Sequence, residues 1–284
     1  MSIIIENLTH IYNKGTAFEK AAVKNINIEI AKGEFAAIIG HTGSGKSTLV
    51  QHFNALIKPS SGRVLLDGFD IHSDKSRLKE TRSRVGLVFQ YPEHQLFEMT
   101  VAKDVAFGPE NMGLGKAETE ARVRESLALV GIGADMYEKS PFELSGGQKR
   151  RVAIAGVLAM RPEVLVLDEP AAGLDPSGRD EIFGAIKNMR GKLGITVILV
   201  SHSMEDVARL AEKIYVMRDG EIAMSGTPAE VFARYAELED MGLAAPQITY
   251  LAGELEKRGA RLGGTFFTVG EAAGAVDRWL RGPA

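Results

Sequence analysis

Short, mostly apolar runs recur along the chain, and each has the length of a buried β-strand. An almost uninterrupted apolar run predicts a strand that is covered on both faces, as in a parallel sheet. Segments with helical spacing of apolar residues separate several of these runs. This alternation is typical of an α/β fold, with a mostly parallel sheet flanked by helices. The predicted buried strands are residues 35–39, 85–89, 164–167 and 195–200.

Further strands are predicted from alternation and from hairpin signals. Residues 23–30 largely alternate apolar and polar side chains, which indicates a strand with one buried face. Asp-Gly pairs at 67–68 and 219–220 are typical of hairpin turns. Residues 11–15 carry a tyrosine in a polar setting and are predicted to form a turn. The remaining strands are predicted at residues 3–8, 63–66, 214–217 and 221–224.

The helices are predicted between and after these strands. Pro92 excludes a regular helix in residues 91–99, and the Gly-Pro pair at 108–109 is predicted to end the helix that follows. Another helix is predicted to begin at Pro176, with Asp175 as its N-cap. In the middle of the chain the predicted helices cover residues 100–107, 116–130 and 148–160.

Beyond about residue 236 the chain changes character, with two predicted helices separated by a glycine pair. The second follows a capping-box pair, Thr268 and Glu271, in which each side chain can bond the other residue's backbone. We therefore predict a main domain over residues 1–235 and a small C-terminal extension over residues 236–284. The apolar stripe of the first helix consists of Ile248, Leu251 and Leu255.

Residues 40–48 contain the pattern of a phosphate-binding loop, and they lie between a predicted buried strand and a predicted helix. Its glycines let the backbone turn several N–H groups toward a phosphate. Lys46 can reach the β- and γ-phosphates, and the Ser47 hydroxyl can ligate Mg²⁺. The predicted nucleotide-binding residues are Gly40, His41, Thr42, Gly43, Ser44, Gly45, Lys46, Ser47 and Thr48.

An acidic pair follows the predicted strand at residues 164–167. A nucleoside triphosphatase needs a carboxylate for its metal ion and a group that handles the attacking water. Asp168 is predicted to hold Mg²⁺, and Glu169 is predicted to act as the general base. Two solvated acids at a strand end are the alternative, which the apolar run before the pair and Pro170 after it disfavour.

The pentapeptide Leu144, Ser145, Gly146, Gly147 and Gln148 begins a predicted helix. A hydroxyl and two glycines at a helix N-terminus form a second place where an anion can bind. An ordinary serine N-cap is the simpler interpretation of the serine alone. The complete L-S-G-G-Q sequence, between a phosphate loop and an Asp-Glu strand end, favours a role at the nucleotide.

With these motifs in this order, residues 3–232 resemble the nucleotide-binding subunit of ATP-binding cassette (ABC) transporters. The resemblance implies the P-loop NTPase fold of an ABC-type nucleotide-binding domain, which adds an antiparallel β subdomain and a helical subdomain to the parallel sheet. The helical subdomain would cover about residues 91–160. The resemblance also implies a head-to-tail dimer, in which the pentapeptide of one subunit contacts the ATP held by the other.

The same resemblance implies further residue roles. Gln90 would sense Mg²⁺ and the attacking water, His202 would hold the γ-phosphate and that water, and Asp175 would lie across the dimer interface. Tyr12 would stack on adenine, with Phe18 as the rival for this role. The implied catalytic set is Glu169, His202, Gln90 and Lys46, and the implied metal set is Ser47, Gln90 and Asp168.

A finer resemblance points to the A-component ATPases of energy-coupling factor (ECF) transporters, and to the second of the two A-component types. It is carried by residues 15–20, 89–97 and 105–109 and by His41 in the phosphate loop. It implies ATP and Mg²⁺ as cofactors and an importer of vitamins and some metal ions.

The partners that this resemblance implies are protein subunits. They are a second ABC ATPase subunit, with a heterodimer favoured over a homodimer, a transmembrane coupling protein that meets residues 91–115, and a substrate-binding membrane protein. The C-terminal extension would stabilise the dimer. The subunit would be peripheral, on the cytoplasmic face of the cell membrane.

Composition reduces the number of protein classes to which the chain could belong. The chain has 284 residues, no cysteine and a formal net charge of −3, so disulfides and thiolate sites are excluded and no overall basic signal indicates nucleic acid. We see no signal peptide, and no apolar run approaches the ~20 residues that span a bilayer. A conventional ABC importer or exporter remains the alternative. A DNA-repair or ribosome-associated ATPase is disfavoured, because the chain lacks sustained heptads, a basic cluster and a second cassette.

Overall fold

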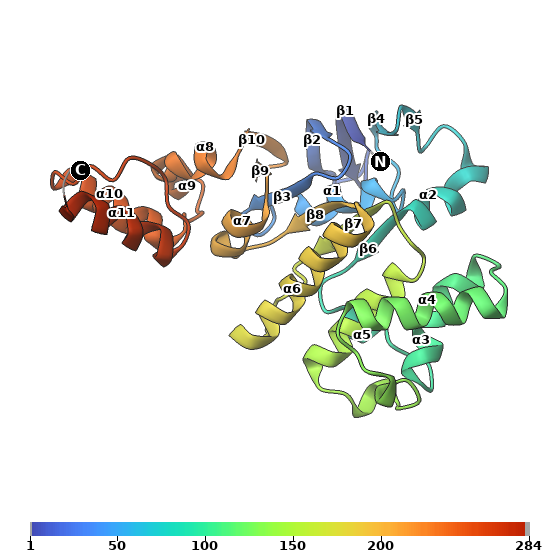
Figure 1. Cartoon of the computed structure of the whole chain (residues 1–284). Helices are drawn as coiled ribbons and strands as arrows, with labels where there is room; N and C mark the ends of the chain where they lie inside the picture. The colour runs from blue at the N-terminus through green and yellow to red at the C-terminus, as the bar shows by residue number, and fades with distance from the viewer. Residues whose placement is uncertain (1, 282–284) are drawn as a thin grey trace.

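The computed structural model describes residues 2–281 and contains a six-stranded and a four-stranded sheet with helices around them (Figure 1). Neighbouring strands of the six-stranded sheet run parallel, except for the antiparallel pair at one edge. The predicted mostly parallel sheet is therefore confirmed. In spatial order its strands are β10 (Glu221–Gly226), β9 (Lys213–Arg218), β3 (Phe35–Gly40), β8 (Thr196–Val200), β7 (Val164–Asp168) and β6 (Val85–Val88).

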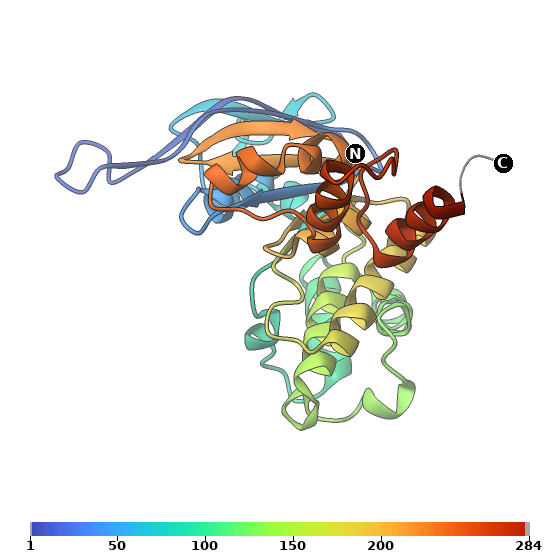
Figure 2. The same cartoon turned by 90° about the vertical axis from the view of Figure 1, so that its left-hand side faces the viewer.

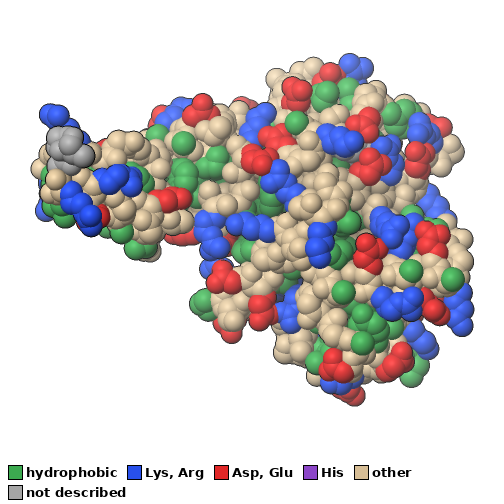
Figure 3. Space-filling view, in the orientation of Figure 1, with side chains coloured by type: hydrophobic (Ala, Val, Ile, Leu, Met, Phe, Trp, Pro, Cys, Tyr) green, Lys and Arg blue, Asp and Glu red, His purple; other side chains and the backbone are tan. Residues whose placement is uncertain are grey.

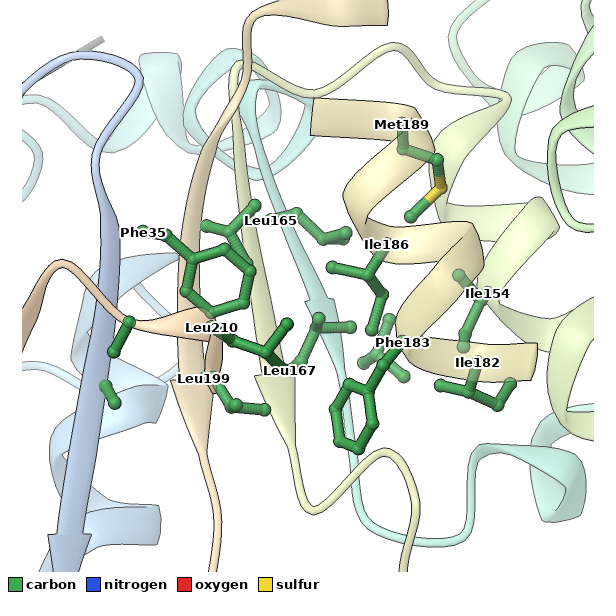
Figure 4. Close-up of a cluster of buried hydrophobic side chains, with 14 of the residues drawn as sticks. Phe35, Ile154, Leu165, Leu167, Ile182, Phe183, Ile186, Met189, Leu199 and Leu210 are labelled. Atoms are coloured by element: carbon green, nitrogen blue, oxygen red, sulfur yellow. The ribbon is translucent and has the colours of Figure 1, made fainter. Parts of the chain in front are cut away.

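Four of its strands, β3, β6, β7 and β8, are buried at every position, which explains their continuous apolar runs. Along β3, Phe35, Ala37 and Ile39 belong to one core cluster, whereas Ala36 and Ile38 belong to the other. Helix α6 (Pro176–Leu193) covers the first face. Figure 4 shows Phe183 and Ile186 of this helix pointing toward the strands that carry Leu165, Leu167 and Leu199, whereas Ile182 lies beside Ile154. Met189 and Phe35 belong to the same core cluster.

The second sheet is antiparallel and packs with helix α1 (Lys46–Phe53) over the other face. Its strands are β2 (Lys20–Ile30), β1 (Ile3–Tyr12), β4 (Ser61–Leu66) and β5 (Phe69–Asp70), in that spatial order. The turn predicted at residues 11–15 starts too early, because Ile11 and Tyr12 still pair with β2. The tip of this hairpin projects from the body of the molecule (Figure 2).

The segment between β4 and β7 is mainly helical. Helix α3 continues through Gly108 and Pro109, so the predicted break there is wrong. A proline this close to a helix end removes only one backbone bond, and the absence of a Cβ at Gly108 leaves room for Met160. The elements are η1 (Lys75–Arg77), α2 (Leu78–Arg84), η2 (Pro92–Gln95), α3 (Val101–Asn111), α4 (Lys116–Leu129), η3 (Ala134–Met136), η4 (Pro141–Glu143) and α5 (Gly146–Leu158).

The C-terminal helices lie beside the sheets and then extend away from them (Figure 1). Helices α10 and α11 form a small apolar cluster of their own, in which Ile248 and Leu255 take part while Leu251 is exposed. Thr268 and Glu271 make the predicted capping bonds. The helices are α7 (Met204–Leu210), α8 (Pro228–Ala233), α9 (Tyr235–Asp240), α10 (Gln247–Lys257) and α11 (Val269–Arg281).

Candidate functional site

A cleft of about 670 Å³ lies where several parallel strands of the main sheet end. Carboxyl ends of parallel strands share one edge of a sheet, so residues that follow β3, β6, β7 and β8 meet there although the sequence separates them widely. Most of the predicted site residues line this cleft. They are Tyr12, Thr42, Gly43, Gly45, Lys46, Ser47, Thr48, Gln90, Asp168, Glu169 and His202.

The phosphate loop is fixed from behind by neighbouring backbone. A Cβ at Gly45, whose φ is 103°, would lie 2.4 Å from the carbonyl oxygen of Ala22, so only glycine fits. The Ser44 carbonyl accepts the Gly220 N–H at 3.0 Å, from the turn between β9 and β10. Gly40, His41 and Ser44 belong to the loop but do not line the cleft.

Lys46 is a nearly buried cation, 7% exposed, whose ammonium donates to the carbonyl oxygens of Gly40 at 2.6 Å and His41 at 3.0 Å. Burial lowers its pKa, against the attraction of Glu169 and Asp168. Burial also raises the pKa of Asp168, against a hydrogen bond with Ser47 and the charge of Lys46. A hydroxyl and a carboxylate in contact are oxygen donors of the kind that Mg²⁺ takes alongside substrate phosphates, so the residues fit this ion.

Glu169 follows Asp168 with a left-handed backbone, φ 52°, held by its N–H bond to Val200 O at 3.0 Å. Burial raises its pKa to about 7. A carboxyl group with this pKa can exchange a proton near neutral pH, as a general base must. His202 Nε2 lies 3.4 Å from Glu169 Oε1, and burial lowers the pKa of His202. The contact is therefore between a carboxyl group and a neutral imidazole at neutral pH, not an ion pair.

The two aromatic candidates for the adenine contact differ in position. Tyr12 lines the cleft, and its hydroxyl lies 3.3 Å from Thr48 Oγ1. Phe18 is 81% exposed near the hairpin tip and does not line the cleft. The geometry therefore favours Tyr12 over Phe18.

A separate cleft of about 590 Å³ is lined by Asp175 and by three pentapeptide residues, Ser145, Gly147 and Gln148. Ser145 caps α5 by accepting the Gln148 N–H at 3.3 Å, while Gln148 Oε1 accepts the Ser145 N–H at 2.9 Å. Leu144 is buried and Gly146 begins the helix. Asp175 caps α6 through the Gly178 N–H at 2.8 Å. No residue of the phosphate loop lines this second cleft.

Arg150 is a functional candidate that the sequence did not reveal. It is 2% exposed, and its guanidinium binds both carboxylate oxygens of Glu93, at 3.0 and 2.6 Å. It also donates to Ala172 O at 2.6 Å. One side chain thus connects the helix of the pentapeptide, the segment after Gln90 and the loop before Asp175. Only its place directly after the pentapeptide could have drawn attention to it.

Lysines of β2 are also new at the site. Lys20 and Lys24 line the phosphate-loop cleft, together with Asp219 of the β9–β10 turn. The sequence predicted residues 23–30 as a strand and gave them no role at the site. The pairing of β2 with β1 brings β2 beside the phosphate loop.

Comparisons with known proteins agree with these motifs. The ABC transporter family profile matches residues 23–172. The energy-coupling factor transporter ATP-binding protein EcfA2 of Clostridium tetani is 56% identical over 273 residues, covering 96% of this chain and 95% of that protein. Its namesake from Caldanaerobacter subterraneus is 56% identical over 282 residues, covering 99% of both.

Solved structures support the same assignment. The structure of cbiO1 from Clostridium perfringens, described as part of the ABC transporter complex cbiONQ, has a TM-score of 0.76 at 42% identity and covers 90% of this chain and 98% of that one. A dimeric ATP-binding cassette bound to ADP and Pi has a TM-score of 0.71 at 31% identity, covering 80% and 98%. The chain therefore belongs to the ABC transporter family and, within it, to the ATP-hydrolysing subunits of energy-coupling factor importers.

Proposed function

We propose that this subunit hydrolyses ATP at sites shared between two subunits, and that the closing and opening of the dimer drives import. The observation that carries the proposal is the separation of two clefts in one chain. The phosphate loop, Asp168 and Glu169 line one cleft, whereas Ser145 and Gly147 line the other. A head-to-tail partner would bring its pentapeptide to the ATP on this phosphate loop and receive this chain's pentapeptide in return.

In this site the residues act on phosphates and water. Lys46 and the N–H groups of residues 42–48 bind the β- and γ-phosphates, and the N-terminus of α1 adds a partial positive charge. Ser47, Asp168 and Gln90 would hold Mg²⁺, which would supply positive charge against the phosphates. Glu169 accepts a proton from the attacking water.

Other residues position the reactants. His202 orients the γ-phosphate and the water, and Tyr12 stacks on adenine. Asp175 lies at the interface beside the partner's site. The pentapeptide, Leu144 to Gln148, contacts the partner's ATP through Ser145 and Gly147.

A third cleft, of about 800 Å³, is the proposed contact with a transmembrane coupling protein. Phe97 and Phe107 line it with ring centroids 5.0 Å apart, and they are 59% and 46% exposed. Asp104 orders this edge by accepting the N–H groups of Phe97 and Glu98, both at 2.9 Å. Exposed rings over an ordered backbone suit an apolar helix of a partner.

We divide the chain into an ABC ATPase domain over residues 1–235, with a helical subdomain over about 91–160, and an extension over 236–284 that stabilises the dimer. The extension has its own apolar cluster. It also exposes Leu251, Val269, Trp279 and Leu280, which a second subunit could cover. We favour a heterodimer with a second A-component over a homodimer.

The cargo is a vitamin or related micronutrient, carried through a substrate-binding membrane protein. The subunit lies on the cytoplasmic face of the cell membrane through its partners. In residues 2–281 no helix combines the length and apolar character needed to cross a membrane. Positive and negative side chains are interspersed on the face in Figure 3, so this face offers no basic patch for nucleic acid.

Glu169→Gln tests the composite site. The amide keeps the size of the side chain but cannot take the proton, so ATP binding should persist while hydrolysis in the assembled transporter falls by ~10²-fold or more. Size-exclusion chromatography with ATP should then show a trapped dimer. Wild-type turnover in this variant would refute the role of Glu169.

Partner identity needs a separate experiment. Mild detergent extraction of the tagged subunit, followed by mass spectrometry, should recover a second ATPase and membrane subunits in fixed ratio. Recovery of nucleic acid or ribosomal proteins instead would overturn the transport assignment.

A further inference from the structure

Two histidines, His10 on β1 and His52 on α1, form a series of ring contacts that ends at Tyr12. His10 and Tyr12 are two residues apart on β1, so their side chains share one face of the strand. The ring centroids of Tyr12 and His10 lie 4.6 Å apart at an interplanar angle of 74°. The His10 ring in turn lies 5.0 Å from the His52 ring, at 70°. Both contacts have the edge-to-face geometry that aromatic rings prefer.

Hydrogen bonds fix each histidine ring. His52 is completely buried on α1, and its Nδ1–H donates to the carbonyl oxygen of Thr48 at 2.8 Å. The His10 Nδ1–H donates to the carbonyl oxygen of Lys58 at 3.1 Å. Because a carbonyl oxygen only accepts, these bonds also fix the protonated nitrogen of each neutral ring.

The contacts close into a circuit between β1 and the phosphate-loop helix. Tyr12 packs on His10, His10 packs on His52, and His52 binds the backbone of Thr48. Thr48 Oγ1 then lies 3.3 Å from the Tyr12 hydroxyl. Tyr12 itself is 39% exposed and is the last residue of β1, next to the exposed hairpin tip.

We propose that His10, supported by His52, is a positioning residue that holds the Tyr12 ring at the cleft for stacking on adenine. This inference rests on the proposed adenine contact of Tyr12. The circuit fixes the Tyr12 ring relative to α1, the helix that also carries Lys46 and Ser47. The adenine and the phosphates of one ATP are thus bound by groups that α1 holds at a fixed separation. Burial lowers the pKa of His52 to about 4, and the supporting ring is therefore neutral at neutral pH.

The first test is a double-mutant cycle on ATP affinity, measured by fluorescent-nucleotide displacement with the full chain. Tyr12→Ala should weaken ATP binding by about five-fold or more, the range of one base stacked on an aromatic ring. His10→Ala should weaken it by about two- to ten-fold, the range of one ring pair, with kcat at saturating ATP in the assembled transporter unchanged. In the Tyr12→Ala background, His10→Ala should cause no further loss.

Matched variants separate the ring of His10 from its hydrogen bond. His10→Phe keeps a ring and should restore most of the affinity, whereas His10→Asn keeps a short donor without the ring and should not. Thermal melts of each variant show whether a loss of affinity accompanies unfolding.

The outcomes distinguish the inference from its premise. Equal losses from His10→Ala in both backgrounds, or no loss in either, would overturn the positioning role while leaving the Tyr12 contact intact. If Tyr12→Ala alone leaves ATP affinity unchanged, the adenine contact itself is wrong, and the inference fails with it.

Discussion

The two halves of the proposed composite site are built differently. In the phosphate-loop cleft, Lys46 and Asp168 are nearly buried and burial shifts the pKa of both. In the pentapeptide cleft, Ser145 is exposed and is paired with Gln148 of its own helix. One half places charged groups in a desolvated setting where they act strongly on a phosphate, and the other presents a preformed helix N-terminus to a partner.

This difference assigns separate tasks. In the proposed site, phosphate binding and hydrolysis are tasks of one chain, because Lys46, Asp168 and Glu169 line the same cleft. In the same proposal, the second chain completes the site. Arg150 is one physical connection between the halves, since it joins the pentapeptide helix to the segment after Gln90.

The largest expected effect separates binding from hydrolysis. Lys46→Ala removes a charge-assisted phosphate contact and should weaken ATP binding to the isolated chain by ~10-fold or more. Ser145→Arg should leave that affinity within about two-fold, yet reduce hydrolysis in the assembled transporter by ~10²-fold, because it blocks the partner's site. Calorimetric ATP binding and phosphate release measure the two effects. If Ser145→Arg weakens binding to the isolated chain as Lys46→Ala does, the two-cleft comparison is wrong.

Removing the Arg150 guanidinium, which connects the two halves, should lower the free energy of unfolding. Arg150→Met leaves Glu93 without its cation and the carbonyl oxygens of Pro170 and Ala172 without their donor. The free energy of unfolding in urea should therefore fall by ~3 kcal/mol. Arg234 forms an exposed pair with Glu237 and serves as the control. Arg234→Met should leave the urea midpoint unchanged. Equal effects of the two substitutions would show that the burial of Arg150 carries no special weight.

Low pH should reduce the stability of the fold near the phosphate loop through His52. Its pKa is about 4 in the fold, below the ordinary value of 6.5. Between these values the unfolded chain binds a proton that the folded chain does not, so stability is lost as pH falls from about 6.5 to about 4. The loss approaches ~3 kcal/mol at the lower end. Comparing urea unfolding of His52→Phe with the wild type at pH 7 and pH 4.5 isolates this contribution, which should be absent from the variant.

The sequence predicted those features of the two clefts that depend on residues close together in the chain. The phosphate loop, the acidic pair at the end of β7 and the caps at Asp175 and Thr268 are each specified within a few residues. The parallel sheet then brings strand ends together by topology alone. The adenine role of Tyr12 rests on the family resemblance and stays a prediction. The local pattern placed this residue in a turn, whereas it lies at the end of β1.

Contacts between distant segments could not be predicted in this way. The packing of Met160 at Gly108 allows α3 to continue past the point where Gly-Pro suggested a break. Arg150 meets Glu93, which lies 57 residues earlier, and His10 meets His52 across two elements. Nothing local to any of these residues indicates the partner. Leu251 is likewise exposed because α10 packs against its neighbours through other residues. Helical spacing alone does not show which residues of the apolar stripe are buried.

The smallest expected effect provides the sharpest comparison, because the chain contains two similar helix caps with different surroundings. Ser145 and Thr227 each form a capping box, with Gln148 and Glu230. Replacing either by alanine removes one capping bond, so each substitution should lower the free energy of unfolding by ~1 kcal/mol.

Only one of these caps faces a proposed nucleotide site. Ser145→Ala should therefore lower hydrolysis in the assembled transporter by about ten-fold, the value of one hydrogen bond to a charged phosphate, while Thr227→Ala leaves it unchanged. Urea unfolding and phosphate release on the same preparations give both numbers. If the two alanine variants lose activity equally, the loss follows helix stability, and the exposed serine has no role at the partner's ATP beyond that of a cap.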